Sequence, residues 1–542
     1  METFTVTLIV LAAIAFGTVI ERILPLPVPA PLIQTALGVL ISLTTSYDIE
    51  IEPHIFFIIF IPPLLFLDGW RIPNDELLRD SPTVLSLAIG LVVVTVLGAG
   101  LFIHWMVPAI PLGVAFALAA IISPTDPVAV SAIAARTPVP KRIMHILEGE
   151  SLLNDASGLV AMKFAVAAVL TGSFSFFSAS ETFGWLALGG IVTGVAMTFV
   201  ITALKSQISR RLGYHGPARI LTSILTPFVA YIIAEHIEAS GILAAVASGI
   251  AMSVAERNDT DLAVTRIDRK AVWETIYFAA SGATFVILGE QLPRLIDGAS
   301  DLVVETGHGN PLWIVVYVLA ISAFLAAARF IWVKISLLLT FRKEMHGDTR
   351  LQTFRLTSVI TLAGARGTVT LAGIMTLPLV MTDGSEFPAR DLAILLAAGV
   401  ILVSLIVASV GLPVALKGLR MDEGEDHEQQ IDRALVLSAQ AAIVATEKRA
   451  LEIREDVDET ALQRQTRLIL DFYRNRIDEK TSDFGEFQPR SGSRELMRVL
   501  LASAVKAERE EVFRLVRAKE LPEDAARKLV DDIDLIEARF AP

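Results

Sequence analysis

Hydrophobic residues along this chain gather in runs of about 20, the length that an α-helix needs to cross the hydrocarbon core of a bilayer. Short polar segments that contain Pro, Gly or charged residues separate the runs. This pattern predicts about thirteen membrane spans. They cover residues 3–21, 28–46, 52–68, 82–104, 110–135, 141–171, 183–204, 217–237, 241–255, 271–292, 312–340, 352–378 and 391–417. The expected fold class is therefore an all-α polytopic membrane protein.

The basic residues of the connecting segments fall mostly on one side of the predicted spans. That side carries Arg71, Arg79, Arg142, Arg211, Lys270 and Arg355 among others, whereas the opposite side carries Arg294 and Arg390. Cytoplasmic loops of membrane proteins are enriched in Lys and Arg. The pattern therefore predicts an N-terminus outside the cell and a C-terminal segment in the cytoplasm.

The composition changes beyond Arg420, where charged residues alternate with leucines and isoleucines at helical spacing. We therefore divide the chain into a transmembrane domain, residues 1–420, and a helical cytoplasmic C-terminal domain, residues 421–542. The net charge of −12 argues against nucleic-acid binding, which needs a basic surface. With no cysteine and only eight histidines, none of them closely paired, the chain is expected to hold no disulfide and no cofactor.

Ionisable residues interrupt two adjacent apolar segments between residues 121 and 160. The first segment reads SPTDPVAV and places Thr125 and Asp126 between Pro124 and Pro127. Two prolines three residues apart remove two backbone donors, so a continuous helix is not expected there. A carboxylate within a membrane is costly and indicates an ion or proton site. Broken helices with polar groups at the centre of the membrane are typical of secondary transporters.

The second segment reads GESLLNDASG and contains Glu150, Ser151, Asn154 and Asp155. On a helix these positions, at i, i+1, i+4 and i+5, share one face. Carboxylate, hydroxyl and amide oxygens suit a hard cation such as Na⁺. Because desolvation favours the protonated form of a carboxylate, such a site can bind a cation and a proton in turn.

An intramembrane cation is expected to neutralise part of this charge. Arg366 lies in ITLAGARGTVTLAGI between Gly364 and Gly367, which permit local unwinding and close approach. If Arg366 pairs with Glu150, Asp155 remains as the titrating carboxylate. Asp126 is the alternative partner, and the spacing does not decide between the two.

Three further charged residues are less clearly connected with this site. Asp68 lies near the inner end of its span, either as an interfacial carboxylate close to Arg71 or as part of the ion path. Arg329 and Lys334 are expected at the cytoplasmic interface or at an anionic lipid headgroup.

The segments SPTDPVAV and EGESLLNDASG, together with GARGTVTLA, resemble the monovalent cation:proton antiporter-1 family, the NhaP-type and NHE-type Na⁺/H⁺ exchangers. The resemblance covers roughly residues 1–420. It implies an NhaA-like fold with inverted repeats and two crossed broken helices, a homodimer in the plasma (inner) membrane, and elevator-type alternating access.

The resemblance also implies roles for individual residues. Asp155 would bind cation and proton, and Asn154 would replace the second aspartate of electrogenic relatives, which implies electroneutral 1:1 exchange. The cation- and proton-binding set would consist of Asp155, Asn154, Ser151, Thr125 and Asp126. Asp155, Ser151 and Thr125 would hold Na⁺, with Thr125 and Asp126 in the unwound crossing. Glu150 and Arg366 would form a structural ion pair. Relatives often carry the acidic residue directly after the PPLLF-like segment, whereas here Leu67 precedes Asp68.

The expected function is therefore a secondary active antiporter that exchanges Na⁺, Li⁺ or K⁺ for H⁺. Its partners are monovalent cations, protons and membrane lipid. The alternatives are a K⁺/H⁺ antiporter with the same mechanism, or a pH-gated cation channel or sensor. A membrane enzyme is disfavoured because the sequence contains no nucleophile–base constellation, metal motif or phosphate-binding loop.

Overall fold

The structure is a computed structural model that describes residues 2–24, 28–45, 53–72, 81–126, 139, 141–172, 176–212, 216–256, 263–297, 310, 312–340, 350–417, 425–455, 457–479 and 494–539. Within these ranges the elements are helices, and the only strand-like pairing is a bridge between Val380 and Glu386. The predicted all-α class is confirmed.

The membrane part begins with α1 (Glu2–Ile23), α2 (Ala30–Thr44), α3 (Pro53–Arg71), α5 (Ser81–Leu85), the π-helix η1 (Ser86–Leu91), α6 (Val92–Met106), α7 (Leu112–Ile122) and α9 (Lys141–Thr171). It continues with α10 (Phe176–Leu212), α11 (Gly216–His236), α12 (Gly241–Glu256), α13 (Ala263–Asp297), α15 (Leu312–Thr340), α16 (Arg350–Leu362), α17 (Thr368–Met375) and α18 (Arg390–Leu416). Eight of the described helices are long and apolar enough to cross a membrane.

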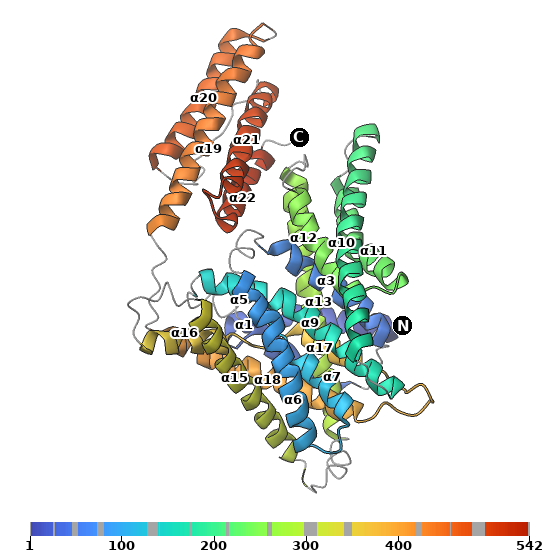
Figure 1. Ribbon diagram of the computed structural model, residues 1–542. Helices are drawn as coiled ribbons and strands as arrows, with labels where there is room; N and C mark the ends of the chain where they lie inside the picture. Colours follow the sequence, from blue (N-terminus) through green and yellow to red (C-terminus); the bar gives the residue numbers. More distant parts are fainter. Residues whose placement is uncertain are drawn as a thin grey trace.

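These helices pack into two groups (Figure 1). The flanking bundle contains α1–α3 and α10–α13, in which α2 lies along α13 and α12 packs between α3 and α10. The crossing bundle contains α5, η1, α6, α7, α9 and α15–α18. Helices α3 and α13 of the flanking bundle contact α17 of the crossing bundle, so the boundary between the two groups runs past the interrupted helices.

Two interruptions lie at the positions predicted from the sequence. Helix α7 ends at Ile122, and Ser123–Asp126 continue without helical structure. Helix α16 ends at Leu362 and α17 starts at Thr368, with Arg366 in the non-helical link. The break beside Pro124 is confirmed up to Asp126, and the residues around Pro127 lie outside the described part of the chain.

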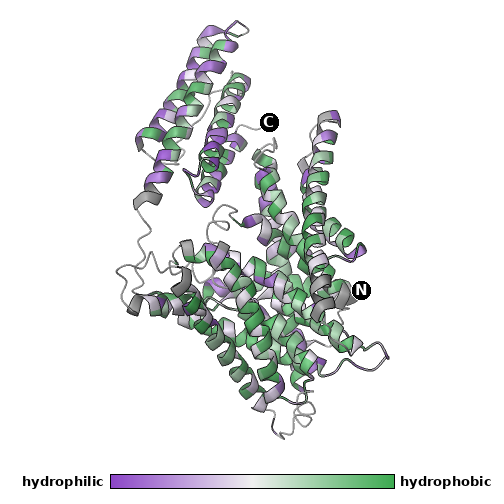
Figure 2. Ribbon diagram, viewed as in Figure 1, coloured by the Kyte–Doolittle hydropathy of each residue, from purple (hydrophilic) through white to green (hydrophobic). Residues whose placement is uncertain are grey.

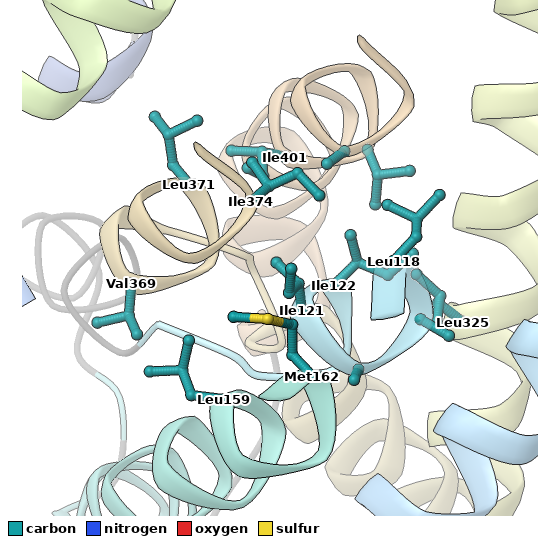
Figure 3. Close-up of a cluster of buried hydrophobic side chains, with 14 of the residues drawn as sticks. Leu118, Ile121, Ile122, Leu159, Met162, Leu325, Val369, Leu371, Ile374 and Ile401 are labelled. Atoms are coloured by element: carbon teal, nitrogen blue, oxygen red, sulfur yellow. The ribbon is translucent and has the colours of Figure 1, made fainter. Parts of the chain in front are cut away.

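Apolar side chains fill the space around the breaks (Figure 3). Ile121 and Ile122 of α7 lie beside Met162 of α9, and Ile374 of α17 lies beside Ile401 of α18. The helices that carry the polar segments are thus embedded in a close-packed apolar core, which restricts the positions that their polar groups can take.

Most of the membrane part consists of hydrophobic residues (Figure 2), and many of their side chains are exposed on its outside. Leu97, Trp105, Leu188, Leu319 and Val410 are each more than half exposed. Exposed apolar surface of this extent is expected where lipid surrounds the helices.

The C-terminal helices are α19 (Glu425–Glu452), α20 (Glu459–Glu479), α21 (Arg494–Arg517) and α22 (Glu523–Arg539). They bury an apolar core of their own, which includes Leu435, Ile469, Leu500 and Ile533. Their outer faces are hydrophilic (Figure 2), and α22 contacts α13 of the flanking bundle.

Candidate ion-binding site

The two interrupted segments touch at their non-helical residues. The backbone N–H of Asp126 donates to the carbonyl of Ala365 at 2.7 Å. The guanidinium of Arg366 donates from Nε to the carbonyl of Ile122 at 3.0 Å and from Nη1 to that of Gly364 at 2.8 Å. Arg366 therefore places positive charge where α7 ends and just after the end of α16. The carbonyl of Ile122, the last residue of α7, is one that a helix leaves unpaired at its negative end, and the carbonyl of Gly364 lies in the link that follows α16.

The carboxylate of Asp126 has the complementary position at the start of α17. Its Oδ2 accepts the backbone N–H of Thr368, the first residue of that helix, at 3.1 Å. A negative group is favourable there, because the helix N-terminus is its positive end. A Cβ at Gly367 would overlap the Asp126 carboxyl group, so this glycine is required for the close approach.

The polar face predicted on α9 is present and buried. Glu150 is 0%, Ser151 3%, Asn154 1% and Asp155 4% exposed. Asn154 donates from Nδ2 to Thr125 Oγ1 at 3.1 Å, and the hydroxyl of Thr125 reaches Oε1 of Glu150 at 3.5 Å. The structure thereby brings the α9 face and the break after α7 together, as the sequence predicted.

The ion pair expected between Glu150 and Arg366 is wrong, because the partner of Glu150 is Arg329 of α15. Arg329 Nη2 donates to Glu150 Oε2 at 2.8 Å, Nη1 pairs with Oε1, and Nε donates to the carbonyl of Ile360 at 3.1 Å. Arg329 is 2% exposed, so the expected interfacial or lipid-contacting position is also wrong. The physical reason is that Arg366 is engaged by the backbone of the crossing, whereas α15 places Arg329 against α9.

Two oxygen-bearing groups on α9 remain available. Within the described part of the chain, Asn154 Oδ1 is buried and accepts no hydrogen bond, and Asp155 has no ion-pair partner. A buried acceptor without a donor is costly, and a cation would satisfy it. Among the described residues, the arrangement therefore offers one carboxylate without an ion-pair partner next to an amide oxygen that accepts no hydrogen bond.

Asp68 and Tyr277 join this site from the flanking bundle. Asp68, on α3, is partly buried and close enough to Asp126 and Asp155 to interact with them electrostatically. Tyr277, on α13, interacts with the same carboxylates, and the guanidinium of Arg71 lies 5.2 Å from the centre of its ring. Asp68 thus has electrostatic neighbours both in the site, at Asp126 and Asp155, and at the end of α3, at Arg71.

Comparison with known proteins agrees with this geometry. The family described as "Sodium/hydrogen exchanger, transmembrane" matches residues 8–418. The chain belongs to this family. It is therefore a multi-pass membrane protein of a transporter family.

Two relatives match the chain over nearly its whole length. The sequence is 39% identical to a sodium, potassium, lithium and rubidium/H⁺ antiporter of Bacillus pumilus, covering 100% of this chain and 78% of that protein. It is 37% identical to an uncharacterized Na⁺/H⁺ exchanger of Escherichia coli, YjcE, covering 99% of both. The solved structure of the sodium proton antiporter MjNhaP1 from Methanocaldococcus jannaschii matches with a TM-score of 0.58 at 18% identity, over 77% of this chain and 99% of that one. The fold of this exchanger-family chain is thus that of an NhaP-type antiporter.

Sequence reasoning missed two residues of this exchanger site. Arg329 gave a weak signal as a basic residue inside the apolar segment 312–340, where a charge is costly without a partner. Tyr277 gave no comparable signal, because a single tyrosine in a long apolar helix is common at an interface or in a core.

Proposed function

We propose that this chain exchanges Na⁺, Li⁺ or K⁺ for H⁺ across the plasma membrane, with Asp155 as the site where cation and proton compete. The observation that carries the proposal is the buried Asp155 carboxylate, which has no ion-pair partner in the described residues and lies one residue from the unsatisfied Oδ1 of Asn154. Membership of the sodium/hydrogen exchanger family supports it.

The proposed cation ligands are Asp155, Asn154, Ser151 and Thr125. Hydroxyl, amide and carboxylate oxygens are suitable for a hard monovalent cation. Asp126 is proposed to act next to this set by fixing the start of α17, a role supported by its hydrogen bond from Thr368. Glu150 is proposed to be structural, because it forms a buried ion pair with Arg329.

Exchange is proposed to be electroneutral, with one cation for one proton. With Glu150 held by Arg329 and Asp126 at a helix N-terminus, Asp155 is the carboxylate whose charge changes during the cycle. If a proton or a monovalent cation always accompanies Asp155 through the membrane, the loaded site carries the same charge in both directions.

Alternating access is proposed to occur by movement of the crossing bundle against the flanking bundle, in a homodimer. The packing of the helices into two groups, with the site near their boundary, supports this mechanism. The proposed orientation, with the N-terminus outside and residues 421–542 as a cytoplasmic domain, is supported by the basic loops and by the separate core of the C-terminal helices.

The range of transported cations is proposed to include K⁺ as well as Na⁺ and Li⁺. The Bacillus pumilus relative is named as an antiporter of sodium, potassium, lithium and rubidium, and the match to it covers the whole chain. Strict K⁺/H⁺ exchange with the same mechanism is the second candidate.

The decisive experiment measures cation-induced proton movement in proteoliposomes with a pH dye inside, with and without a clamp on the membrane potential. Na⁺-, Li⁺- or K⁺-driven movement that does not depend on the clamp is expected. Asp155→Asn is expected to abolish it while the purified protein stays folded. Asp391→Asn removes an exposed carboxylate at the start of α18 and serves as the matched control.

The outcomes separate the candidates. Retained exchange in Asp155→Asn would exclude Asp155 as the shared site, and a response to K⁺ alone would select the K⁺/H⁺ antiporter. Proton movement that depends on the clamp of the membrane potential would contradict the 1:1 stoichiometry. Cation flux without any proton movement would favour the channel.

A further inference from the structure

Helix α22 is held against the membrane part by pairs of opposite charge. Arg266 of α13 donates to both carboxylate oxygens of Asp534, at 2.8 and 2.5 Å, and lies 3.3 Å from Glu537. One turn further along α13, Lys270 pairs with Asp531 at 2.7 Å. The Arg266 and Asp534 side chains are only 14% and 6% exposed, so this contact is shielded from solvent, unlike a typical surface ion pair.

The same helix also closes the end of α3. Arg527 of α22 donates from Nη2 to the carbonyl of Ile72 at 2.9 Å and from Nη1 to that of Arg71. These carbonyls lie where α3 ends, and a guanidinium is the group that such a helix end favours. α22 is thus fixed to two helices of the flanking bundle, α13 and α3.

From this position α22 also acts on the crossing bundle. Glu148 of α9 is partly buried and interacts electrostatically with Arg527 and Asp524 of α22 and with Arg71 of α3. Glu148 lies seven residues before Asp155, so the two carboxylates share one face of α9 about two turns apart.

A path of charged groups therefore leads from α22 to the binding site. Asp68 interacts with Glu148 on one side and with Asp155 on the other. The path runs along the boundary between the two bundles, where α3 meets α9. An ion that approaches Asp155 from the side of the C-terminal helices would pass Glu148. The cationic side chains that act electrostatically on Glu148 are Arg527 of α22 and Arg71 of α3, and Arg527 also lies 3.4 Å from Glu523 of its own helix.

We infer that α22 gates the inner entrance of the ion path, with Arg527 competing against incoming cations for Glu148. The inference rests on the proposed exchange function and orientation. Glu148 attracts cations towards Asp155, and Arg527 reduces that attraction while α22 is docked. Because α22 is bound to the flanking bundle and Glu148 belongs to the crossing bundle, the gate also responds to the relative position of the two bundles.

The contact itself can be tested by crosslinking in the otherwise cysteine-free chain. Lys270→Cys combined with Asp531→Cys, treated with a short bismaleimide in membrane vesicles, is expected to give a linked peptide in mass spectrometry. The single variants control for unspecific reaction. Absence of the linked peptide in vesicles that contain folded protein would overturn the docked position of α22.

The gate is tested by measuring, in everted vesicles, the cation concentration that gives half-maximal exchange. Arg527→Gln is expected to lower this concentration by about threefold or more, the effect of one charge near a partly exposed partner. Arg514→Gln is the matched control, because Arg514 is a half-exposed arginine of α21 that pairs with Glu511. In right-side-out vesicles, where cations reach the opposite side, Arg527→Gln is expected to have no effect.

A double-mutant cycle decides whether Glu148 is the group that Arg527 acts on. Glu148→Gln is expected to raise the half-maximal concentration and to abolish the effect of Arg527→Gln. An equal effect of Arg527→Gln with and without Glu148, or no effect in everted vesicles, would overturn the gate. Lack of exchange in the parent protein would instead overturn the proposed function. Exchange by the parent protein is therefore measured before any variant is compared with it.

Discussion

The carboxylate of Glu150 is bound by both terminal nitrogens of Arg329, a residue 179 positions later in the chain. Both side chains are almost completely buried, at 0% and 2% exposure. Each charge is therefore stable inside the membrane part only because the other is present. The pair fixes α15 against the α9 face that carries Asn154 and Asp155.

Replacing Arg329 is expected to destabilise the fold. Arg329→Gln leaves Glu150 buried without a cation, which costs about 3–5 kcal/mol, and thermal unfolding of the purified protein in detergent measures the loss. The double variant Glu150→Gln with Arg329→Gln is expected to recover most of it. If Glu150 were instead coupled to Arg366, the Glu150→Gln and Arg329→Gln variants would have additive effects on stability. In that case Glu150→Gln and Arg366→Gln would have non-additive effects.

Gly367→Ala is expected to disrupt the crossing of the two broken helices. A Cβ at this position would overlap the Asp126 carboxyl group, so the chain must shift at a cost of about 1–3 kcal/mol or more. Thermal stability and cation-driven proton movement are both expected to fall. Gly184→Ala in α10 meets open space and is expected to be neutral or slightly stabilising. Equal behaviour of the two variants would contradict the close approach at Gly367.

Thr125→Val tests the hydroxyl that links the break to α9. The change keeps the shape but removes the acceptor for Asn154 and the donor to Glu150. About a fivefold rise in the cation concentration for half-maximal exchange is expected, as for the loss of one buried hydrogen bond. Thr198→Val in α10 removes a buried hydroxyl that bonds only to backbone carbonyls and is expected to leave this concentration unchanged.

The C-terminal helices are expected to lose stability as the pH rises. Burial raises the pKa of Glu508 above its ordinary value, against the lowering effect of Arg476. Because the folded state binds this proton more tightly, the stabilisation is complete below the unfolded pKa of about 4.5 and is lost as the pH rises through the raised pKa. The slope is at most about 1.4 kcal/mol per pH unit.

Hydrogen exchange of α20 and α21, corrected for the intrinsic effect of pH, measures this dependence. Glu508→Gln can still accept the hydrogen bond that Tyr473 donates to Glu508 at 3.0 Å, and it is expected to flatten the pH profile. A profile that stays as steep in Glu508→Gln as in the parent protein would assign the dependence to another group.

Local sequence was sufficient for the broken helices and for the polar face. Pro124 ends α7 close to where it stands, because a proline acts on the backbone of its own turn. Glu150 and Asp155 share a face because helical periodicity alone puts them there. The all-α class and the helices beyond Arg420 followed equally from composition and from the length of the apolar runs.

The partners of these groups were decided only by the tertiary structure. Arg329 and Arg366 are both buried arginines in apolar segments. Only the packing of α15 against α9 assigns the first to Glu150 and leaves the second to the carbonyls of Ile122 and Gly364. Likewise, Tyr277 and the contact of Arg266 with Asp534 depend on helices that are distant in the chain. Helix periodicity and proline chemistry act within a few residues, whereas an ion pair depends on where whole helices lie.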